Sequence, residues 1–418
     1  MRLDKFQVIG LFDLYNHTLD FTKEENTKQN ESEGASVIMI YGRNGVGKTT
    51  ILRMIDGLMT LNFDVFRNSK FKKACLTFST GDKISVELVI EEQENSYLSV
   101  KYKDLETKLH PKEKGAYSPE EYEKEVIFVK QYNSDLDKFS FEFIDTERLI
   151  RRNIKDEMAV LDPKLYGKLT KIQKSESNKY LVEKVRGFIR DSQINFSNYF
   201  YRTEPELFDK ILANLERPQE LKSEELLERI EAIIRSEIEY KIDTLGLVKE
   251  KWDKMKLIEI INNSALDQNK LTIIASYIEV LESRNLERMS LAERLIKFES
   301  LLNEFLYDKK ISINNKGFLI NSINSTKDSL NEDQLSTGEY HLLYLTSLAL
   351  CTKVKGTVIA IDEPEMSMHI GWQRKLVNAL VQISSKASPQ MIFATHSPDI
   401  AINFPNSLTT EGYGPENN

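Results

Sequence analysis

Residues 42–49, Gly42-Arg43-Asn44-Gly45-Val46-Gly47-Lys48-Thr49, decide the fold. The stretch fits G-x-x-x-x-G-K-[ST], the pattern of a phosphate-binding loop. It follows a continuous apolar run at 37–41, which is typical of a strand buried on both faces. Apolar residues at helical spacing come next, up to Thr60. The sequence therefore predicts strand, loop and helix in that order.

The chemistry of this loop explains its residue types. Glycines let the backbone curve with its N–H groups turned inward, Lys48 can reach the β- and γ-phosphates, and the Thr49 hydroxyl can hold Mg²⁺. A structural glycine-rich turn is the alternative, but the strand and helix around the loop argue against it. The residues that we expect to bind ATP are Gly42, Asn44, Gly45, Gly47, Lys48, Thr49 and Thr50.

A second apolar run, at 357–361, ends in the paired acids Asp362 and Glu363. A buried strand that ends in two carboxylates can use the first to hold hydrated Mg²⁺ and the second to polarise the attacking water. Such acids can also be exposed turn residues. Because the phosphate-binding loop is present, we assign Asp362 to the metal and Glu363 to catalysis.

The segment Leu335-Ser336-Thr337-Gly338-Glu339 begins an apolar helix. A hydroxyl and backbone N–H groups at the start of a helix, with no bulky side chain in the way, form an anion site. Since Lys48 already serves the phosphates of its own chain, we expect this site to contact ATP held by another copy. An ordinary N-cap with a helix-favouring Glu is the alternative reading. Ser336, Gly338 and Glu339 are thus predicted to act in trans.

Two further polar residues complete the predicted site. His396 follows the apolar run at 391–394, where its side chain could sense the γ-phosphate. Gln131 follows the apolar run at 126–129, which we interpret as a strand, and could contact Mg²⁺ or the attacking water. A structural histidine and a polar strand end are the alternatives. We count both residues as catalytic, and Gln131 also as a metal ligand.

The pattern along the chain predicts an α/β ATPase lobe interrupted by helices. Residues 1–131 read as a strand-rich lobe around one helix, with an antiparallel sheet of three short strands after Thr60. Residues 132–309 read as helices whose Leu, Ile and Phe stripes indicate core packing, without the sustained heptads of a long coiled coil. Residues 310–418 return to α/β alternation. We expect a mixed core sheet with flanking helices, an antiparallel sheet and a compact helical insertion lobe.

The amino-acid composition limits the classes of protein to which this chain can belong. Of the 418 residues, 40% are hydrophobic and 29% charged, as in a folded globular protein, and the two cysteines suggest core residues and not a disulfide framework. Without a membrane-length apolar run or a secretion signal, we expect a cytoplasmic protein that does not contact a membrane.

Charge is unevenly distributed. The net charge of −8 argues against indiscriminate nucleic-acid binding. However, residues 148–190 carry twelve Lys or Arg against five Asp or Glu, and residues 204–250 carry seven against thirteen. Such runs are commonly solvated helix faces. The alternative is a basic docking surface for an acidic partner or for nucleic acid.

Taken together, these elements resemble the ABC ATPase superfamily: a phosphate-binding loop, a Q-loop glutamine, a signature, paired acids and a switch histidine. Within it, the chain is similar to the RecF, SMC and OLD-like branch. The signature carries Glu339 where transporters usually carry Gln, and residues 362–369 are similar to the DEPE-x-x-LH pattern of OLD-like ATPases. Residues 394–398 and the opening segments 9–12 and 19–21 also match that branch. The resemblance implies that ATP and Mg²⁺ bind between two copies of the chain.

The resemblance also suggests a biological setting. OLD nucleases continue past the switch histidine into a Toprim nuclease domain, whereas about twenty residues follow it here, so we expect no nuclease in this chain. Stand-alone ATPases of this branch, such as AriA of PARIS and PtuA of Septu, are halves of two-gene anti-phage systems. We therefore expect a homo-oligomeric switch that controls a separate effector, such as a nuclease. A RecF-like DNA-repair or DNA-clamp ATPase and the ATPase subunit of a membrane transporter are the alternatives.

Overall fold

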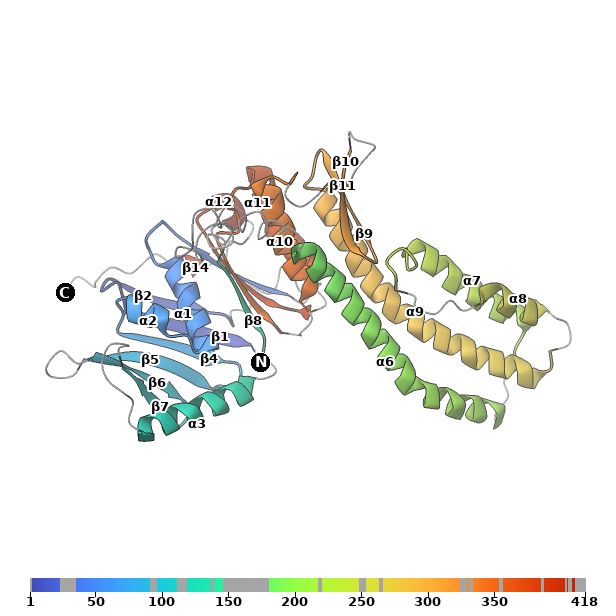
Figure 1. Cartoon of the computed structure of the whole chain (residues 1–418), viewed down its shortest axis with the longest axis horizontal. Helices are drawn as coiled ribbons and strands as arrows, with labels where there is room; N and C mark the ends of the chain where they lie inside the picture. The colour runs from blue at the N-terminus through green and yellow to red at the C-terminus, as the bar shows by residue number, and fades with distance from the viewer. Residues whose placement is uncertain are drawn as a thin grey trace, which may run out of the picture. The chain divides into compact units, whose positions relative to one another are not determined.

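The computed structural model divides the chain into two compact units: residues 1–170 with 352–418, and residues 171–351 (Figure 1). We call the first the ATPase unit and the second the helical unit. The structure describes residues 2–22, 35–90, 96–110, 119–136, 139–145, 180–216, 220–247, 253–262, 266–323, 329–330, 334–352, 356–384, 387–402, 404 and 408–409.

The core of the ATPase unit is a five-stranded sheet in the order β14-β3-β13-β12-β8. Every neighbouring pair is parallel, so the carboxyl ends of all these strands lie along one edge. The three central strands are apolar runs buried on both faces, as parallel strands between helices require. The strands are β3 (Ser36–Tyr41), β8 (Phe141–Asp145), β12 (Val358–Asp362), β13 (Gln390–Thr395) and β14 (Leu408–Thr409).

A second sheet in the same unit is antiparallel throughout, in the order β2-β1-β4-β5-β6-β7. Its strands alternate buried and exposed residues, because one face packs on the core and the other meets solvent. This confirms the expected antiparallel sheet, with four strands after the first helix where three were expected. The strands are β1 (Leu3–Leu11), β2 (Tyr15–Asp20), β4 (Lys73–Phe78), β5 (Lys83–Ile90), β6 (Ser96–Tyr102) and β7 (Leu105–Leu109).

Between the two sheets lies the helix that follows the phosphate-binding loop. It buries Ile51, Leu52, Met54, Ile55 and Leu58 in a core shared by both sheets. The mixed α/β head predicted from the sequence is therefore confirmed. The helices of this unit are α1 (Lys48–Thr60), α2 (Asp64–Asn68), α3 (Pro119–Leu136), α11 (Ile370–Ser384) and α12 (Pro398–Ala401).

Two expectations about residues 119–145 are wrong. The apolar run 126–129, interpreted as a strand, lies in helix α3, where Phe128 and Tyr132 are buried one turn apart with stacked rings 6.3 Å between centroids. The helical insertion, expected from residue 132, starts later, because β8 at 141–145 pairs with β12 in the core sheet. A strand's partner is a long-range property that its own sequence does not display.

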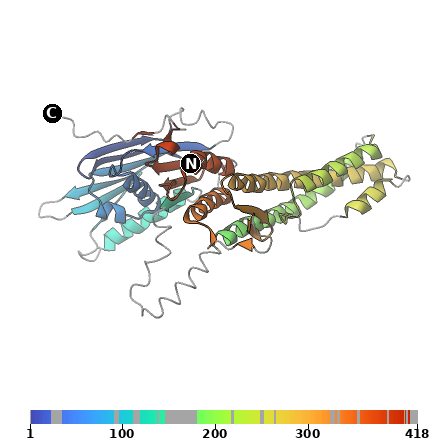
Figure 2. The ribbon, with the colours of Figure 1, turned by 90° about the horizontal axis from the view of Figure 1, so that it is seen from above.

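The helical unit contains two long helices, α6 and α9, that run side by side (Figures 1 and 2). They have 37 and 36 residues, so each is about 55 Å long at 1.5 Å per residue. Helices of this length were not expected, because the sequence lacks a sustained heptad repeat. Two helices can pack side by side and bury apolar residues without such a repeat. The elements are α6 (Tyr180–Glu216), α7 (Ser223–Glu239), α8 (Lys254–Asn262), α9 (Gln268–Asn303), β9 (Lys309–Asn314), β10 (Gly317–Ser322), β11 (Ser329–Leu330) and α10 (Thr337–Cys351).

The boundaries of this unit also differ from the expected 132–309. Contacts assign residues 171–351 to it, including the three-stranded antiparallel sheet β11-β10-β9 and the signature helix α10. The sequence could not show this, because α/β alternation resumes at β9 whichever unit the strands join. The expected core stripe on α9 is confirmed, since Leu291, Leu295, Phe298 and Leu302 are buried.

Among the described helices, none is both long and apolar enough to cross a membrane. Most of the basic stretch 148–190 lies outside the described residues, which resume at 180.

Candidate functional site

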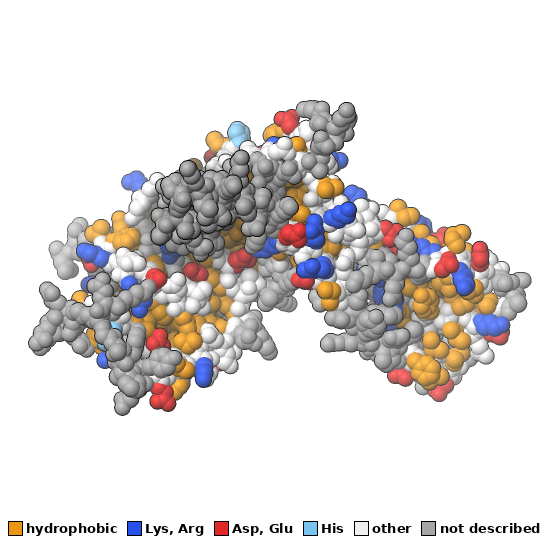
Figure 3. Space-filling view, in the orientation of Figure 1, with side chains coloured by type: hydrophobic (Ala, Val, Ile, Leu, Met, Phe, Trp, Pro, Cys, Tyr) orange, Lys and Arg blue, Asp and Glu red, His pale blue; other side chains and the backbone are white. Residues whose placement is uncertain are grey.

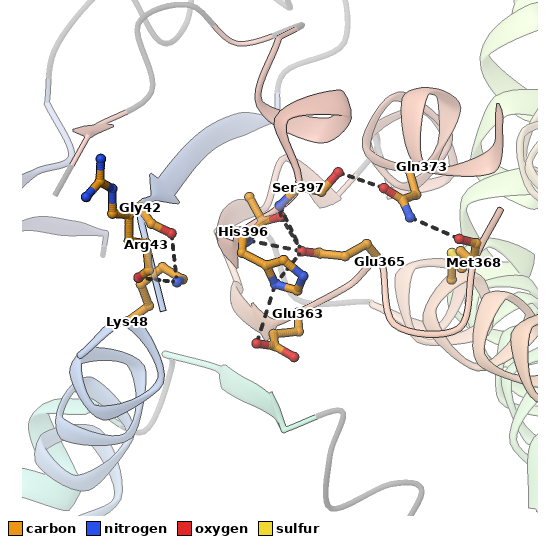
Figure 4. Close-up of polar contacts among 10 residues, drawn as sticks. Gly42, Arg43, Lys48, Glu363, Glu365, Met368, Gln373, His396 and Ser397 are labelled. Carbon is orange, nitrogen blue, oxygen red and sulfur yellow. Dashed lines mark hydrogen bonds and ion pairs between the residues drawn. The ribbon is translucent and has the colours of Figure 1, made fainter. Parts of the chain in front are cut away.

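The phosphate-binding loop, residues 42–47, joins β3 to α1 and is shaped by glycine. Gly47 has a φ of 91°, in the left-handed region that favours glycine, and a Cβ there would lie 2.7 Å from the Leu11 side chain. Lys48 is only 6% exposed, and its ammonium donates to the carbonyl oxygens of Gly42 and Arg43 at 3.0 Å each (Figure 4). The loop thus encloses its own lysine.

A buried histidine supports this loop from the antiparallel sheet. Nε2 of His17, on β2, lies 3.2 Å from the carbonyl oxygen of Val46, a contact in which the imidazole must donate. Burial lowers the pKa of His17, and the carbonyl contact only partly opposes this. A neutral His17 therefore holds the loop without adding charge beneath the phosphate site. Sequence reasoning missed this residue, because nothing near His17 marks it.

Carboxylates gather where β12 and β8 end. Asp362 and Asp145 are register partners on these strands, and the Thr49 hydroxyl on α1 hydrogen-bonds the Asp362 carboxylate. Burial raises the pKa of Asp362 to about 6, and neighbouring Glu363 and Asp145 act in the same direction, whereas the Thr49 hydrogen bond opposes them. Asp145 in turn forms an ion pair with Arg53 of α1 at 2.8 Å.

Three carboxylates at this edge of the sheet also act on the charge of Lys48. Burial lowers the pKa of the Lys48 ammonium, while the negative charges of Glu363, Asp362 and Glu365 oppose that shift. The structure therefore brings together Lys48, Thr49, Asp362 and Glu363, which the sequence predicted as one site. Asp145 and Arg53 are additions that the sequence analysis missed, since β8 was not recognised as a strand.

Glu363 and His396 face each other just beyond the strand ends. Glu363 has a φ of 48°, a left-handed conformation that costs a non-glycine residue energy, and its N–H donates to the Ala394 carbonyl at 2.8 Å. Nδ1 of His396 lies 3.6 Å from Oε1 of Glu363. The turn after β12 thus aims the predicted general base at the predicted sensor.

Glu365 holds the turn that carries His396. Its carboxylate is 4% exposed, and its Oε1 accepts hydrogen bonds from the Thr395 hydroxyl at 2.6 Å and from the N–H groups of His396 and Ser397 at 3.1 and 3.2 Å (Figure 4). Gln373 also supports this turn, because the Ser397 hydroxyl donates to its Oε1 at 2.6 Å. The sequence offered Glu365 only as part of the DEPE pattern.

The residues present fit Mg²⁺. This cation is usually held by one or two carboxylates together with waters and substrate phosphates, and the donors here are the Thr49 hydroxyl and the Asp362 carboxylate. Burial and the neighbouring carboxylates raise the pKa of Asp362, a shift that a divalent cation beside it would counteract. Within the described ranges, no group of three His, Cys, Asp or Glu side chains has the geometry of a protein-only metal site.

The signature residues lie in the helical unit, at the start of α10. The N–H of Ser336 donates to Oε2 of Glu339 at 2.7 Å, and the N–H of Glu339 donates to the Ser336 hydroxyl at 3.3 Å, a reciprocal capping box. Lys309 on β9 binds both Glu339 oxygens, at 2.9 and 2.7 Å. Burial alone would raise the pKa of Glu339, but the bonds from Lys309 and Ser336 lower it. Glu339 is therefore engaged within its own chain.

The position of Gln131 differs from the one that the sequence predicted. It lies on helix α3 and not at a strand end, and its amide donates to both oxygens of Asp135 at 3.1 and 3.2 Å. Asp135 also binds Lys103 at 2.6 Å. No described contact joins Gln131 to Lys48, Asp362 or Glu363. The strand interpretation is therefore wrong, whereas its role as a metal ligand and catalytic residue stays a prediction.

These contacts define what the ATPase unit can do chemically. The glycine-shaped loop with Lys48 can bind phosphates, Thr49 and Asp362 can hold a cation, and Glu363 can polarise a water beside the phosphates. All of these groups lie at the carboxyl edge of one parallel sheet, the usual place for ligands in such folds.

Known proteins resemble this chain at two levels. A family model described as "AAA domain, putative AbiEii toxin, Type IV TA system" matches residues 37–403. Similar solved structures include an Smc head domain with an extended coiled coil from Pyrococcus furiosus, bound to the C-terminal domain of ScpA, at 14% identity and a TM-score of 0.38 over 96% of this chain and 91% of that one. An SMC head domain from Thermotoga maritima has 11% identity and a TM-score of 0.35 over 96% and 92%. None of the curated proteins matches.

Proposed function

The chain belongs to the AAA-domain family named for the AbiEii toxin of type IV toxin–antitoxin systems, and from this membership we propose that it binds ATP with Mg²⁺ and hydrolyses ATP. The observation that carries the proposal is the joint position of Lys48, Asp362 and Glu363. Their charges interact at the carboxyl edge of one sheet, although the sequence places Lys48 far from the two acids. Phosphoryl transfer to water needs these three functions together: a phosphate clamp, a metal ligand and a base.

We further propose that each ATP is shared between two copies of the chain. The phosphate-binding loop lies in the ATPase unit, and Ser336 and Gly338 begin α10 in the helical unit. The start of α10 has a hydroxyl and the backbone N–H groups of the first helical turn, which are the groups that bind phosphate at helix N-termini. Glu339 enters this proposal as the residue that shapes the turn, since Lys309 and Ser336 occupy its carboxylate.

Mixing two inactive variants tests the shared site. Lys48→Ala lacks the phosphate clamp, and Gly338→Asp places a negative charge where the γ-phosphate of the partner's ATP should lie. Each alone should be inactive. In an equal mixture, half the dimers are mixed and each carries one complete site, so about a quarter of wild-type ATPase activity should return in a two-fold symmetric dimer. Measured phosphate release near zero, with mixed dimers confirmed by differential tags, would contradict sharing.

The output of the ATP cycle, on this proposal, is control of a separate effector in anti-phage defence, with PARIS and Septu ATPases as the analogy. The family description names a toxin–antitoxin system, which is a pair of genes and supports a partner outside this chain. The helical unit exposes apolar side chains where α6 ends and α9 begins, among them Phe208, Leu212 and Ile273 (Figure 3). Exposed apolar surface of this kind marks interaction sites.

Purification of the tagged chain from its native cells tests for the effector. We expect the product of a neighbouring gene, such as a nuclease, to co-purify. Charge reversal at Arg151, Arg152, Lys168 and Lys171 should weaken that association while ATP hydrolysis stays near the wild-type rate, because these residues belong to the basic stretch and not to the nucleotide site. If the reversals abolish DNA binding and no protein co-purifies, the RecF-like clamp function replaces the effector model.

A further inference from the structure

The carboxylate of Glu365 has no task in the ATPase chemistry described so far. We propose that Glu365 is a positioning residue: it holds the turn of His396 and keeps a proton on Nδ1 of that imidazole, so that the ring contacts the γ-phosphate as an imidazolium, with a second proton on Nε2 that can be donated to a phosphate oxygen. This inference deepens the proposed ATPase function and rests on it. It assigns a role to the second acid of Asp362-Glu363-Pro364-Glu365 that is separate from metal binding and from water activation.

The first support is the way Glu365 is buried. A carboxylate that is 4% exposed must have its charge compensated, and three donors converge on its Oε1: one hydroxyl and two consecutive backbone N–H groups. All three belong to the turn 395–397, which follows β13. The second oxygen, Oε2, is buried without a hydrogen-bond partner among the described residues. Glu365 therefore fixes the backbone of this turn and still carries a buried, incompletely compensated charge.

The second support is the position of the imidazole. Nδ1 of His396 lies 3.3 Å from Oε1 of Glu365 and 3.6 Å from Oε1 of Glu363, so two carboxylates face the same ring nitrogen. An ionised carboxylate only accepts hydrogen bonds, so a proton on Nδ1 makes both contacts attractive and a lone pair there makes both repulsive. The side chain of Glu363 is 30% exposed and can serve a water molecule, whereas the buried Glu365 cannot.

The turn that carries the imidazole is braced by further hydrogen bonds. The Ser397 hydroxyl donates to Gln373, and the Gln373 amide donates to the carbonyl oxygen of Met368 at 2.9 Å. Glu365 thus holds the backbone of the turn, and Gln373 holds the Ser397 side chain (Figure 4). A carboxylate that sets the tautomer and orientation of a catalytic imidazole is a known device, and its loss alters turnover more than binding.

Glu365→Gln is the discriminating variant. The amide oxygen of Gln can still accept from Thr395, His396 and Ser397, so the turn is retained, but the charge beside Nδ1 is lost. We expect kcat to fall about tenfold, with the KM for Mg-ATP changed less than about threefold. In a His396→Gln background the same substitution should have no further effect on kcat, because Glu365 acts through the imidazole. Glu87→Gln, which makes the same substitution on the exposed face of the antiparallel sheet, is the matched control for the loss of a carboxylate.

A spectroscopic measurement tests the proton directly. The chain has five histidines, so ¹⁵N-histidine labelling gives few signals, and those of His396 are the ones lost in His396→Gln. In nucleotide-free wild type we expect Nδ1 of His396 to carry the proton, and in Glu365→Gln we expect that preference to be lost. This readout needs no ATP hydrolysis. If wild type has no ATPase activity, the proposed function fails while the role of Glu365 is still decided.

Two results would overturn the inference. One is a His396 ring in wild type whose proton resides on Nε2 alone, which can be recorded even if the variants do not fold. The other is a folded Glu365→Gln variant with wild-type kcat and an unchanged His396 spectrum, which would show that Glu365 only accepts backbone hydrogen bonds. An equal loss of kcat from Glu365→Gln with and without His396 would also contradict it, since the effect would then bypass the imidazole.

Discussion

Glu363→Gln should bind ATP about as tightly as wild type and hydrolyse it at least about a hundredfold more slowly, the usual scale for losing a positioned general base. The amide preserves the shape of the side chain, and the strained turn at φ 48° depends on the backbone, so the fold should remain. What is lost is the carboxylate that polarises the attacking water. Single-turnover phosphate release with a parallel nucleotide-binding titration measures both.

Glu87→Gln is a suitable control for this variant. Glu87 pairs with Lys73 at 3.1 Å on the exposed face of the antiparallel sheet, where an ion pair contributes little. Its ATPase rate should therefore equal that of wild type. Wild-type turnover in Glu363→Gln would show that another group polarises the water and would remove Glu363 from the mechanism.

Lys48→Ala should weaken ATP binding on the order of a hundredfold, since a charged hydrogen bond contributes about 1.5–3 kcal/mol. The variant loses the ammonium that the carboxylates of Glu363 and Asp362 surround, so their repulsion toward the triphosphate is no longer offset. Calorimetric titration with a slowly hydrolysed ATP analogue and Mg²⁺ measures the affinity directly.

Lys70→Ala controls for the removal of a lysine from the same unit. Lys70 is exposed and pairs with Asp13 at 3.2 Å on the surface, so its loss should leave affinity unchanged. Thermal unfolding of both variants checks that Lys48→Ala remains folded, because the carbonyls of Gly42 and Arg43 lose their donor. Unchanged affinity in a folded Lys48→Ala protein would contradict the phosphate-clamp assignment.

The sequence predicted the nucleotide half of the site well because its residues are near neighbours. Gly42 to Thr49 form one continuous loop whose chemistry is local, and the strand before it and the helix after it are strongly periodic. Asp362 and Glu363 were found for the same reason, at the end of a buried strand. The mutual proximity of these two groups could be inferred because the carboxyl ends of parallel strands share one edge.

Gln131 shows where this reasoning fails. A four-residue apolar run is compatible with either a strand or a buried helix, and periodicity over so few positions does not separate them. Helix α3 places Ile127 at 49% exposure and buries Phe128, whereas a strand buried on both faces would have covered both. Tertiary packing of Phe128 against Tyr102 of β6 favours the helix, and the sequence does not reveal that packing.

Glu365 and His17 illustrate a different limit. Both matter through hydrogen bonds to backbone atoms of segments about thirty residues away, and a backbone N–H or carbonyl has no identity in the sequence. Asp145 could have been found only by recognising β8, whose alternation of Phe with acidic residues resembles a surface strand. Such supporting residues become visible only when the register of the strands is known.

The pairing of β3 with β13 has a consequence for how the protein is made. The two halves of the ATPase unit are also joined by Gln390, whose side chain exchanges hydrogen bonds with the backbone of Leu3 across 387 positions. At a synthesis rate of about 5–20 residues per second, the N-terminal strands wait roughly 20–80 s on the ribosome for their partners. Until then both edges of β3 lack their partners β13 and β14, while the helical unit, which is a compact unit of residues 171–351, can already fold. The nascent chain should therefore depend on chaperones most strongly just before its last strands emerge.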